Sequence, residues 1–165
     1  MPGNRLPPLG AGFLYVKKQN IPKIWPLFGS GNKAPDDITR LNHTGTYPAA
    51  TDLAIANAID YQNAIGMGRK EARLRYLQDY WSDQVRGLDH VILNTPKEKH
   101  RSCGIANVGI RGINPIELAR ILFDENKIFT VGIDGAGVHG CRISPNLFTT
   151  TVELDVLVAA IAGRT

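Results

Sequence analysis

The sequence predicts an α+β fold, in which a small, mainly antiparallel sheet is covered by helices and preceded by two further helices. Three observations support this. From residue 89 onward, apolar strand-like segments and amphipathic segments follow in the order strand, strand, helix, strand, strand, helix. Two of the predicted helices begin at capping sequences, and residues 48–88 carry apolar side chains at helical spacing. We therefore expect a C-terminal domain over residues 48–165 and a separate segment over residues 1–47.

The segment 1–47 shows little regular structure. Phe13–Val16 is a short apolar run of strand-forming residues after a glycine-containing turn, and it predicts one strand. Residues 19–40 contain three prolines and two glycines, which favours a long loop. One strand and a loop cannot form a stable domain by themselves. We therefore expect residues 1–47 to be the remnant of a larger domain.

Two consecutive helices are predicted next. Apolar residues recur at intervals of three and four over residues 48–65, where Pro48 suits a first turn and Gly66 a stop. The same spacing continues from Leu74 to Leu88 and predicts a second, longer helix.

The first half of the sheet domain begins with two short strands. Val91–Leu93 and Gly104–Val108 have strand-like composition and flank a polar tip at residues 95–102. Asn114–Glu117 then places a capping residue, a first-turn proline and an acidic residue in succession. This combination predicts a helix that runs to about Asn126.

The second half of the domain repeats this order. Ile128–Val131 and Cys141–Ile143 predict another strand pair, joined by a glycine-rich loop over residues 132–140. Thr150–Glu153 forms a second capping box, which predicts the start of the final helix. The apolar stripe of that helix consists of Leu154, Leu157, Val158 and Ile161.

Composition indicates an ordinary soluble globular protein, with 43% hydrophobic and 21% charged residues. No stretch approaches the length of a membrane span, and the first residues lack the apolar core of a signal peptide, so we expect a cytoplasmic protein without membrane contact. Cys103 and Cys141 are then expected to be reduced. The net charge of +4 comes from scattered basic residues without interleaved aromatic residues, which favours a solvated surface over a nucleic-acid site. The four histidines show no metal-ligand spacing, so no metal is expected.

Arg142 is the strongest candidate for a binding residue. It lies on a short apolar strand that runs into a turn and a new helix, where a guanidinium group must be paired or face a cleft. Its planar fork fits a carboxylate bidentately. The alternative is a structural ion pair with an acid such as Asp134 or Asp155.

A second candidate site is the Thr44-Gly45-Thr46 run just before the first predicted helix. Gly45 and Thr46 offer backbone N–H groups and a hydroxyl near a positive helix end, a plausible position for a phosphate group. A simple helix N-cap is the alternative interpretation.

Together these motifs resemble the C-terminal part of class V aminotransferase-family enzymes, which have fold type I and use pyridoxal 5'-phosphate. Gly10–Val16 is similar to the strand that follows the cofactor-binding lysine of that family. Thr44–Pro48 is similar to the segment whose threonine reaches the cofactor phosphate of the partner subunit in a homodimer. Arg142–Pro145, followed by Leu147–Thr150, resembles the ending whose arginine holds the substrate carboxylate.

The resemblance implies a pyridoxal-phosphate enzyme that acts on an amino acid or small peptide as a homodimer. Arg142 would bind the substrate carboxylate, and Thr46 and Gly45 would lie at the cofactor phosphate. The lysine would fall a few residues before Pro8, where residues 1–6 contain none, so this chain alone is expected to have no catalytic residue. The alternative is a non-catalytic α+β binding or assembly module.

Within the family, the sequence looks most similar to the isopenicillin-N epimerase-like branch. Cysteine desulfurases carry a nucleophilic cysteine on the loop ahead of the arginine strand, whereas residues 132–140 contain none. Cys141 is adjacent to Arg142 and is expected to point to the opposite face of the strand. The family's usual histidine, tyrosine and asparagine are replaced by Asn146, Phe148 and Thr149.

Overall fold

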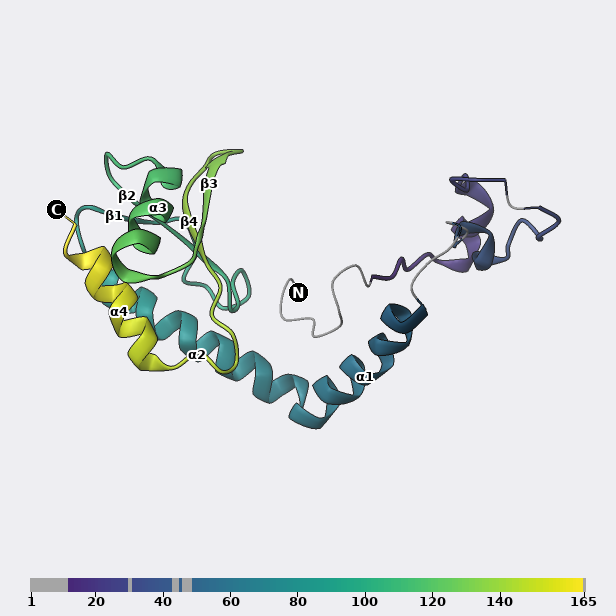
Figure 1. Cartoon of the computed structure of the whole chain (residues 1–165), viewed down its shortest axis with the longest axis horizontal. Helices are drawn as coiled ribbons and strands as arrows, with labels where there is room; N and C mark the ends of the chain where they lie inside the picture. Colours follow the sequence, from purple (N-terminus) through teal and green to yellow (C-terminus); the bar gives the residue numbers. More distant parts are fainter. Residues whose placement is uncertain (1–11, 30, 43–44, 46–48, 165) are drawn as a thin grey trace. The chain divides into compact units, whose positions relative to one another are not determined.

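The computed structural model describes residues 12–29, 31–42, 45 and 49–164 (Figure 1). Contacts divide the chain into two compact units, Met1–Ala64 and Ile65–Thr165, which we call the N-terminal and C-terminal units. Among the described residues, no helix is both long enough and apolar enough to cross a membrane.

The N-terminal unit contains two short 3₁₀ helices, η1 (Lys18–Lys23) and η2 (Ile38–Leu41), and most of helix α1 (Ala49–Ile65). The prediction of α1 is confirmed. The two 3₁₀ helices are joined by Arg40, whose Nη1 donates to the carbonyl oxygens of Ile21 at 3.1 Å and Ile24 at 3.0 Å. The predicted loop over residues 19–40 therefore has two turns that one guanidinium group holds together.

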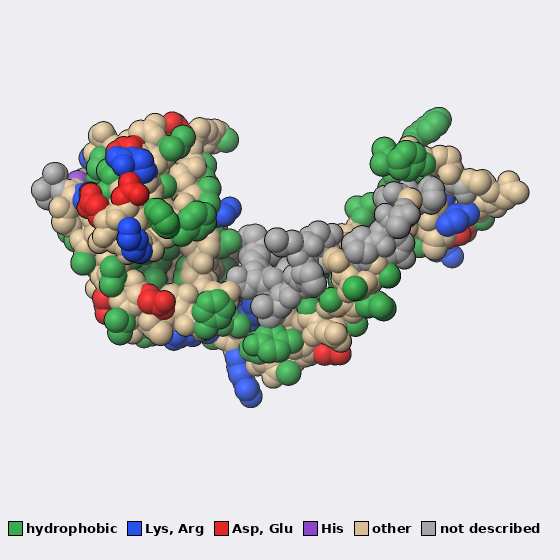
Figure 2. Space-filling model, in the orientation of Figure 1, with side chains coloured by type: hydrophobic (Ala, Val, Ile, Leu, Met, Phe, Trp, Pro, Cys, Tyr) green, Lys and Arg blue, Asp and Glu red, His purple; other side chains and the backbone are tan. Residues whose placement is uncertain are grey.

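The strand predicted at Phe13–Val16 is not formed, because residues 12–17 have no regular structure. Phe13, Leu14 and Tyr15 are 75%, 71% and 78% exposed. A strand needs a neighbour that accepts its backbone hydrogen bonds, and strand-forming composition cannot replace that neighbour. Exposed hydrophobic side chains on the N-terminal unit can be followed in green in Figure 2.

The C-terminal unit has the predicted α+β architecture. Its elements are α2 (Met67–Val85), β1 (Val91–Leu93), β2 (Ala106–Ile110), α3 (Pro115–Asn126), β3 (Val131–Gly135), β4 (Val138–Ile143) and α4 (Thr151–Ala162). The four strands form one sheet in the order β1-β2-β4-β3, and every neighbouring pair is antiparallel. The predicted order of strands and helices is therefore confirmed, and α4 runs alongside α2 in Figure 1.

One face of the sheet packs against the three helices. Side chains from β2 and β4 meet buried residues of α2, α3 and α4 in a single hydrophobic core. Trp81, Leu118 and Ile161 represent the three helices there, each with no exposed surface. Within the C-terminal unit no described helix packs on the other face, which we call the open face.

The capping sequences fix where α3 and α4 begin. Asn114 Oδ1 accepts from the backbone N–H of Ile116 at 2.9 Å, and Pro115 occupies the first helical turn. At α4, the Thr150 and Glu153 side chains each accept from the other residue's backbone N–H, which completes the capping box. Both predicted helix starts are confirmed.

The glycine-rich segment 132–140, predicted as a loop, is a β-hairpin instead. Its two-residue turn is Ala136-Gly137, where φ is 50° and 76°, as a tight hairpin turn requires. Gly132 lies inside β3 because α3 passes close by: a Cβ there would lie 2.6 Å from the Pro115 carbonyl oxygen. The glycine that suggested a loop is therefore needed for packing a helix against a strand.

Candidate functional site

Arg142 lies on the open face of the sheet, near the end of β4. Its neighbours Cys141 and Ile143 are 0% and 5% exposed and face the helices, so alternation along the strand directs Arg142 to the opposite side. The Arg142 side chain is exposed. Among the described residues, no hydrogen bond or ion pair involves the Arg142 guanidinium group.

The structural ion pairs proposed for Arg142 are absent from the described residues, because both acids lie on the helix side of the sheet, opposite Arg142, where each has another partner. Asp134 contacts His139 Nδ1 at 2.5 Å and accepts from Asn114 Nδ2 at 3.3 Å. Asp155 accepts from the Tyr80 hydroxyl at 2.8 Å, and this hydrogen bond raises the pKa of Tyr80. Arg142 therefore remains available to an external anion.

Strand pairing places defined neighbours beside Arg142 on the open face. Arg142 is paired with Asn107 of β2 and with Val131 of β3. The backbone N–H of Asn94, the residue after β1, donates to the Asn107 carbonyl oxygen at 3.1 Å and extends this row. In the next row, Ile92 pairs with Gly109 and Ile133 pairs with Gly140. Asn94, Asn107 and Arg142 thus form a row of polar side chains across the sheet, which we call the polar row, and Arg142 lies at one end of it.

Two asparagine side chains in this row form a connected amide network that the sequence analysis missed. Asn94 Nδ2 donates to Asn107 Oδ1 at 2.6 Å and to the His139 carbonyl oxygen at 3.0 Å. Asn107 Nδ2 donates to the Gly140 carbonyl oxygen at 3.0 Å. The two asparagines are 13 positions apart in the sequence, so only the strand register reveals that they are neighbours.

The segment after Arg142, residues 144–150, is held by α2. Arg73 Nη2 donates to the Thr149 carbonyl oxygen at 2.9 Å, and the Arg73 guanidinium lies 5.4 Å from the centre of the Tyr76 ring. Inside the segment, Thr149 Oγ1 accepts from the Asn146 backbone N–H at 2.9 Å. Phe148 is 78% exposed. Two of the residues that depart from the family's usual ending, Asn146 and Thr149, therefore shape the turn, and the third presents an apolar side chain to its surroundings.

The second candidate site is described only in part. Gly45 is exposed and has a positive φ of 84°, a conformation that favours glycine. Its chain neighbours aside, no described residue places an atom within 4 Å of the position where its Cβ would be. Gly45 is therefore exposed with respect to the described residues, whereas Thr46 lies outside them.

Both cysteines are free thiols. Cys141 has no exposed surface, and its Sγ contacts the Pro115 carbonyl oxygen at 3.3 Å. Burial raises the pKa of the Cys141 thiol. It points to the helix side, away from Arg142, as the alternation of the strand predicts. Among the described residues, no group of three or more potential ligands could hold a metal ion.

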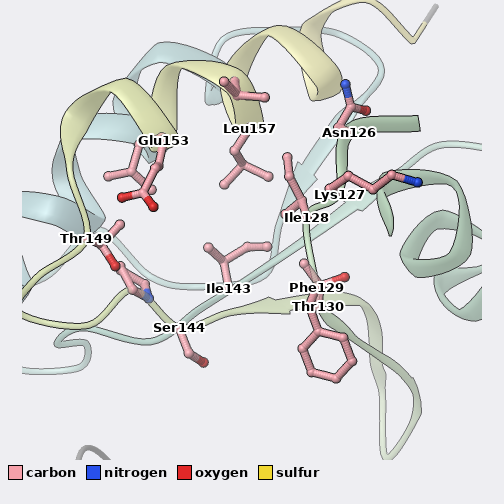
Figure 3. A pocket seen from close by; sticks show the side chains of 13 residues that line it. Asn126, Lys127, Ile128, Phe129, Thr130, Ile143, Ser144, Thr149, Glu153 and Leu157 are labelled. Carbon is pink, nitrogen blue, oxygen red and sulfur yellow. The ribbon is translucent and has the colours of Figure 1, made fainter. Parts of the chain in front are cut away.

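A pocket of about 390 Å³ lies on the helix side of the sheet (Figure 3). It is lined by the connection from α3 to β3, by the end of β4 and by α4. In Figure 3, Ile143 lies on the side of Leu157, whereas Ser144 and Phe129 point away from α4. The pocket therefore does not include Arg142, and the sequence carried no signal for it.

Comparison with known proteins identifies one family. The model of the family described as "Aminotransferase class-V" matches residues 5–157. The chain is 29% identical to a probable cysteine desulfurase of Halobacterium salinarum, over 94% of this chain and 41% of that protein. It is also 29% identical to an isopenicillin N epimerase of Streptomyces clavuligerus, over 97% of this chain and 44% of that protein. The chain thus spans less than half the length of these curated relatives.

Solved structures share the fold. An apo cysteine desulfurase from Thermococcus onnurineus NA1 matches with a TM-score of 0.73 and 18% identity, over 90% of this chain and 41% of that chain. The cysteine desulfurase CsdA from Escherichia coli, an S-sulfonic acid form, matches with a TM-score of 0.73 and 18% identity, over 94% of this chain and 42% of that chain.

Proposed function

Because the chain belongs to the aminotransferase class V family, we propose that it is the C-terminal part of a pyridoxal-phosphate enzyme that acts on an amino acid or small peptide. In this proposal residues 48–165 form the small domain, and residues 1–47 belong to a larger cofactor domain. The observation that carries the proposal is the exposed guanidinium group of Arg142, which has no partner among the described residues.

Arg142 is the residue that would bind the substrate. Its position on a central strand limits where the guanidinium group can reach, and the buried residues on either side fix the face from which it projects. A planar guanidinium group can donate two parallel hydrogen bonds to one carboxylate, which fixes both the position and the orientation of an amino acid. Arg142 would thereby orient the substrate for the reaction.

The cofactor would be held partly by the Gly45-Thr46 segment. The positive φ and the open surroundings of Gly45 are compatible with a phosphate group near its backbone. Bound pyridoxal phosphate supplies an electron sink, and the protein supplies orientation and charge. The lysine that binds this cofactor would belong to a domain outside residues 1–165, and Thr46 would serve the partner subunit of a homodimer.

We favour an epimerase-like reaction over cysteine desulfuration. A desulfurase needs an accessible nucleophilic thiol near the substrate, and the thiolate form is the reactive one. Cys141 is buried with a raised pKa, and the hairpin between β3 and β4 is a tight turn without cysteine. Both observations support the isopenicillin-N epimerase-like branch, although relatives of both kinds match equally well in identity.

The proposal is tested by Arg142→Lys in a complete enzyme that carries this domain. Lysine keeps the charge but loses the bidentate fork, so we expect kcat/KM to fall by about 10- to 100-fold, the loss of one charge-assisted hydrogen bond. Arg120→Lys on α3 is the matched control, because Arg120 pairs with Glu117 and Asp124 on the exposed surface. Unchanged kinetics together with a lower melting temperature for Arg142→Lys would refute the proposal.

A non-catalytic α+β binding or assembly module is the second candidate function. The resemblance places the cofactor-binding lysine a few residues before Pro8. The observation in favour of the module is that residues 1–6 contain no lysine. Such a module would keep the fold and an Arg142 that binds anions. It would not bind the cofactor covalently, even as part of a longer protein.

A further inference from the structure

We propose that Asn94 and Asn107 form a polar subsite beside Arg142 on the open face, which binds an amide N–H group of a substrate whose carboxylate contacts Arg142. The inference rests on the proposed role of Arg142 and deepens it, because it names a second group that the substrate should carry.

The sheet register sets the geometry of the subsite. Arg142 on β4 is paired with Asn107 on β2, and Asn94 follows on the β1 side of Asn107. Neighbouring strands lie about 4.8 Å apart, so the Cα atoms of Asn94 and Arg142 lie about 10 Å apart across the sheet. The Asn94 amide, however, reaches over β2 to the His139 carbonyl oxygen of β4, the strand that carries Arg142. A substrate that contacts both side chains must therefore carry its amide several atoms away from its carboxylate, as a peptide or an amide-bearing side chain does.

The hydrogen bonds of the two asparagine side chains show which of their atoms can still bind a ligand. Both N–H bonds of Asn94 Nδ2 are used, by Asn107 Oδ1 and by the His139 carbonyl oxygen. The Asn107 side chain accepts through Oδ1 from Asn94 and donates through Nδ2 to the Gly140 carbonyl oxygen. The Asn94 Oδ1 oxygen accepts no hydrogen bond from a described residue, and the side chain is exposed. An amide oxygen accepts up to two hydrogen bonds, so Asn94 can accept an N–H group from a ligand.

The network also holds that oxygen in place. Rotating the Asn94 amide by half a turn would replace two N–H donors with an oxygen facing two acceptors, so the orientation is fixed by both contacts. The backbone N–H of Asn107 donates to Thr95 Oγ1 at 2.8 Å and ties the residue after Asn94 to the same strand. An acceptor that is already oriented costs little entropy when it binds.

Two glycines keep the surface low beside the polar row. A Cβ at Gly109 would lie 2.7 Å from the His139 carbonyl oxygen, and one at Gly140 would lie 2.6 Å from the Val108 carbonyl oxygen. Asn107 lies over Gly140, since the same Cβ would also collide with Asn107 Oδ1. The missing side chains therefore leave room for the Asn107 amide over Gly140 and leave the His139 carbonyl oxygen accessible to the Asn94 amide.

The charges favour an amide over an ammonium group. The row contains Asn94, Asn107, Arg142 and Val131, so its one charged side chain is a cation. A second cation bound on this row would be repelled by Arg142, and no acid in the row compensates it. The donor that fits is therefore an uncharged amide.

The test uses matched ligand pairs and the 165-residue chain, titrated by NMR with observation of the asparagine side-chain NH₂ signals. The monoamides of glutaric and suberic acid carry a carboxylate and an amide. 5-Oxohexanoate and 8-oxononanoate replace each NH₂ with CH₃ at the same length. We expect the monoamide of at least one pair to bind about fivefold more tightly than its ketone acid, the effect of one hydrogen bond, and the pair that shows the preference reports the spacing of the two groups.

Variants separate this inference from the role of Arg142. Asn94→Ala should keep binding to both ketone acids and lose the preference for the monoamide, while Arg142→Gln should lose binding of all four ligands. Because the preference is a ratio within one variant, a general loss of affinity or partial unfolding does not imitate it. Equal binding of monoamide and ketone to the wild type would overturn the subsite and leave the Arg142 proposal standing. Carboxylate binding that Arg142→Gln does not weaken would overturn both.

Discussion

Replacement of Gly132 with alanine should destabilise the C-terminal unit, because α3 packs directly against this position of β3. An added Cβ would lie 2.6 Å from the Pro115 carbonyl oxygen and 2.9 Å from Ile116 Cα. Ordinary carbon–oxygen contacts are about 3.3 Å or longer, so the first turn of α3 would have to move by about 0.7 Å. The atoms are backbone, so no side-chain rotation can relieve the contact.

The expected magnitude follows from two opposing effects. Overpacking of this kind costs about 1–3 kcal/mol, and the reduced entropy of the unfolded chain returns about 0.4–1 kcal/mol. We expect Gly132→Ala to lower the free energy of unfolding by about 1–2 kcal/mol. Gly135→Ala in the same strand is the matched control, because no described residue apart from its chain neighbours places an atom within 4 Å of its Cβ position. That control should be neutral or stabilising.

Urea denaturation measures the difference. Trp81 has no exposed surface and reports on the C-terminal unit, whereas Trp25 is 92% exposed and can be replaced with phenylalanine to simplify the fluorescence signal. We expect a lower midpoint for Gly132→Ala with an unchanged dependence on urea concentration. Equal midpoints for the two alanine variants would refute the packing of α3 against β3.

Three further predictions concern separate regions of the chain. Cys103 should react quickly with a thiol reagent in the folded protein, whereas Cys141, which is buried with a raised pKa, should react only on unfolding; fast reaction of Cys103→Ser would contradict this. The hydrogen bond from the Thr150 N–H lowers the pKa of Glu153, so its stabilisation is present above the ordinary glutamate pKa of about 4.3 and is lost as the pH falls through the lower folded value. Glu153→Gln should therefore lose less stability than the wild type on acidification from about pH 5 to about pH 3, and identical pH profiles would count against the capping box. Exposed apolar side chains in residues 12–42 should cause self-association and early proteolysis there, visible by light scattering and mass spectrometry; a monodisperse, protease-resistant monomer would contradict this.

Sequence signals identified the helix starts because those signals are local. A cap forms between residues two or three positions apart, so the Asn114 and Thr150 motifs carried the necessary information by themselves. The hairpin over residues 132–140 was missed because the reason for Gly132 is a tertiary contact with α3. The strand at Phe13–Val16 was predicted from composition, which says nothing about whether a partner strand is present.

The candidate site shows the same division. Arg142 was found from its sequence setting, and the opposite orientations of Arg142 and Cys141 followed from alternation along a strand. That Arg142 forms no ion pair with Asp134 or Asp155 became clear only from the structure, in which both acids have other partners. The contact between Asn94 and Asn107 depended on strand register. Neither property could be predicted without the fold.

The most direct test of the central claim is to locate the covalent attachment of pyridoxal phosphate. The cofactor is added to the complete enzyme and to the 165-residue chain, each is reduced with borohydride, and peptides are mapped by mass spectrometry. We predict one stoichiometric pyridoxyl-lysine in the complete enzyme, outside residues 1–165, and none in the isolated chain. A stoichiometric label on Lys17 or Lys18, or no label anywhere in the complete enzyme, would contradict the account.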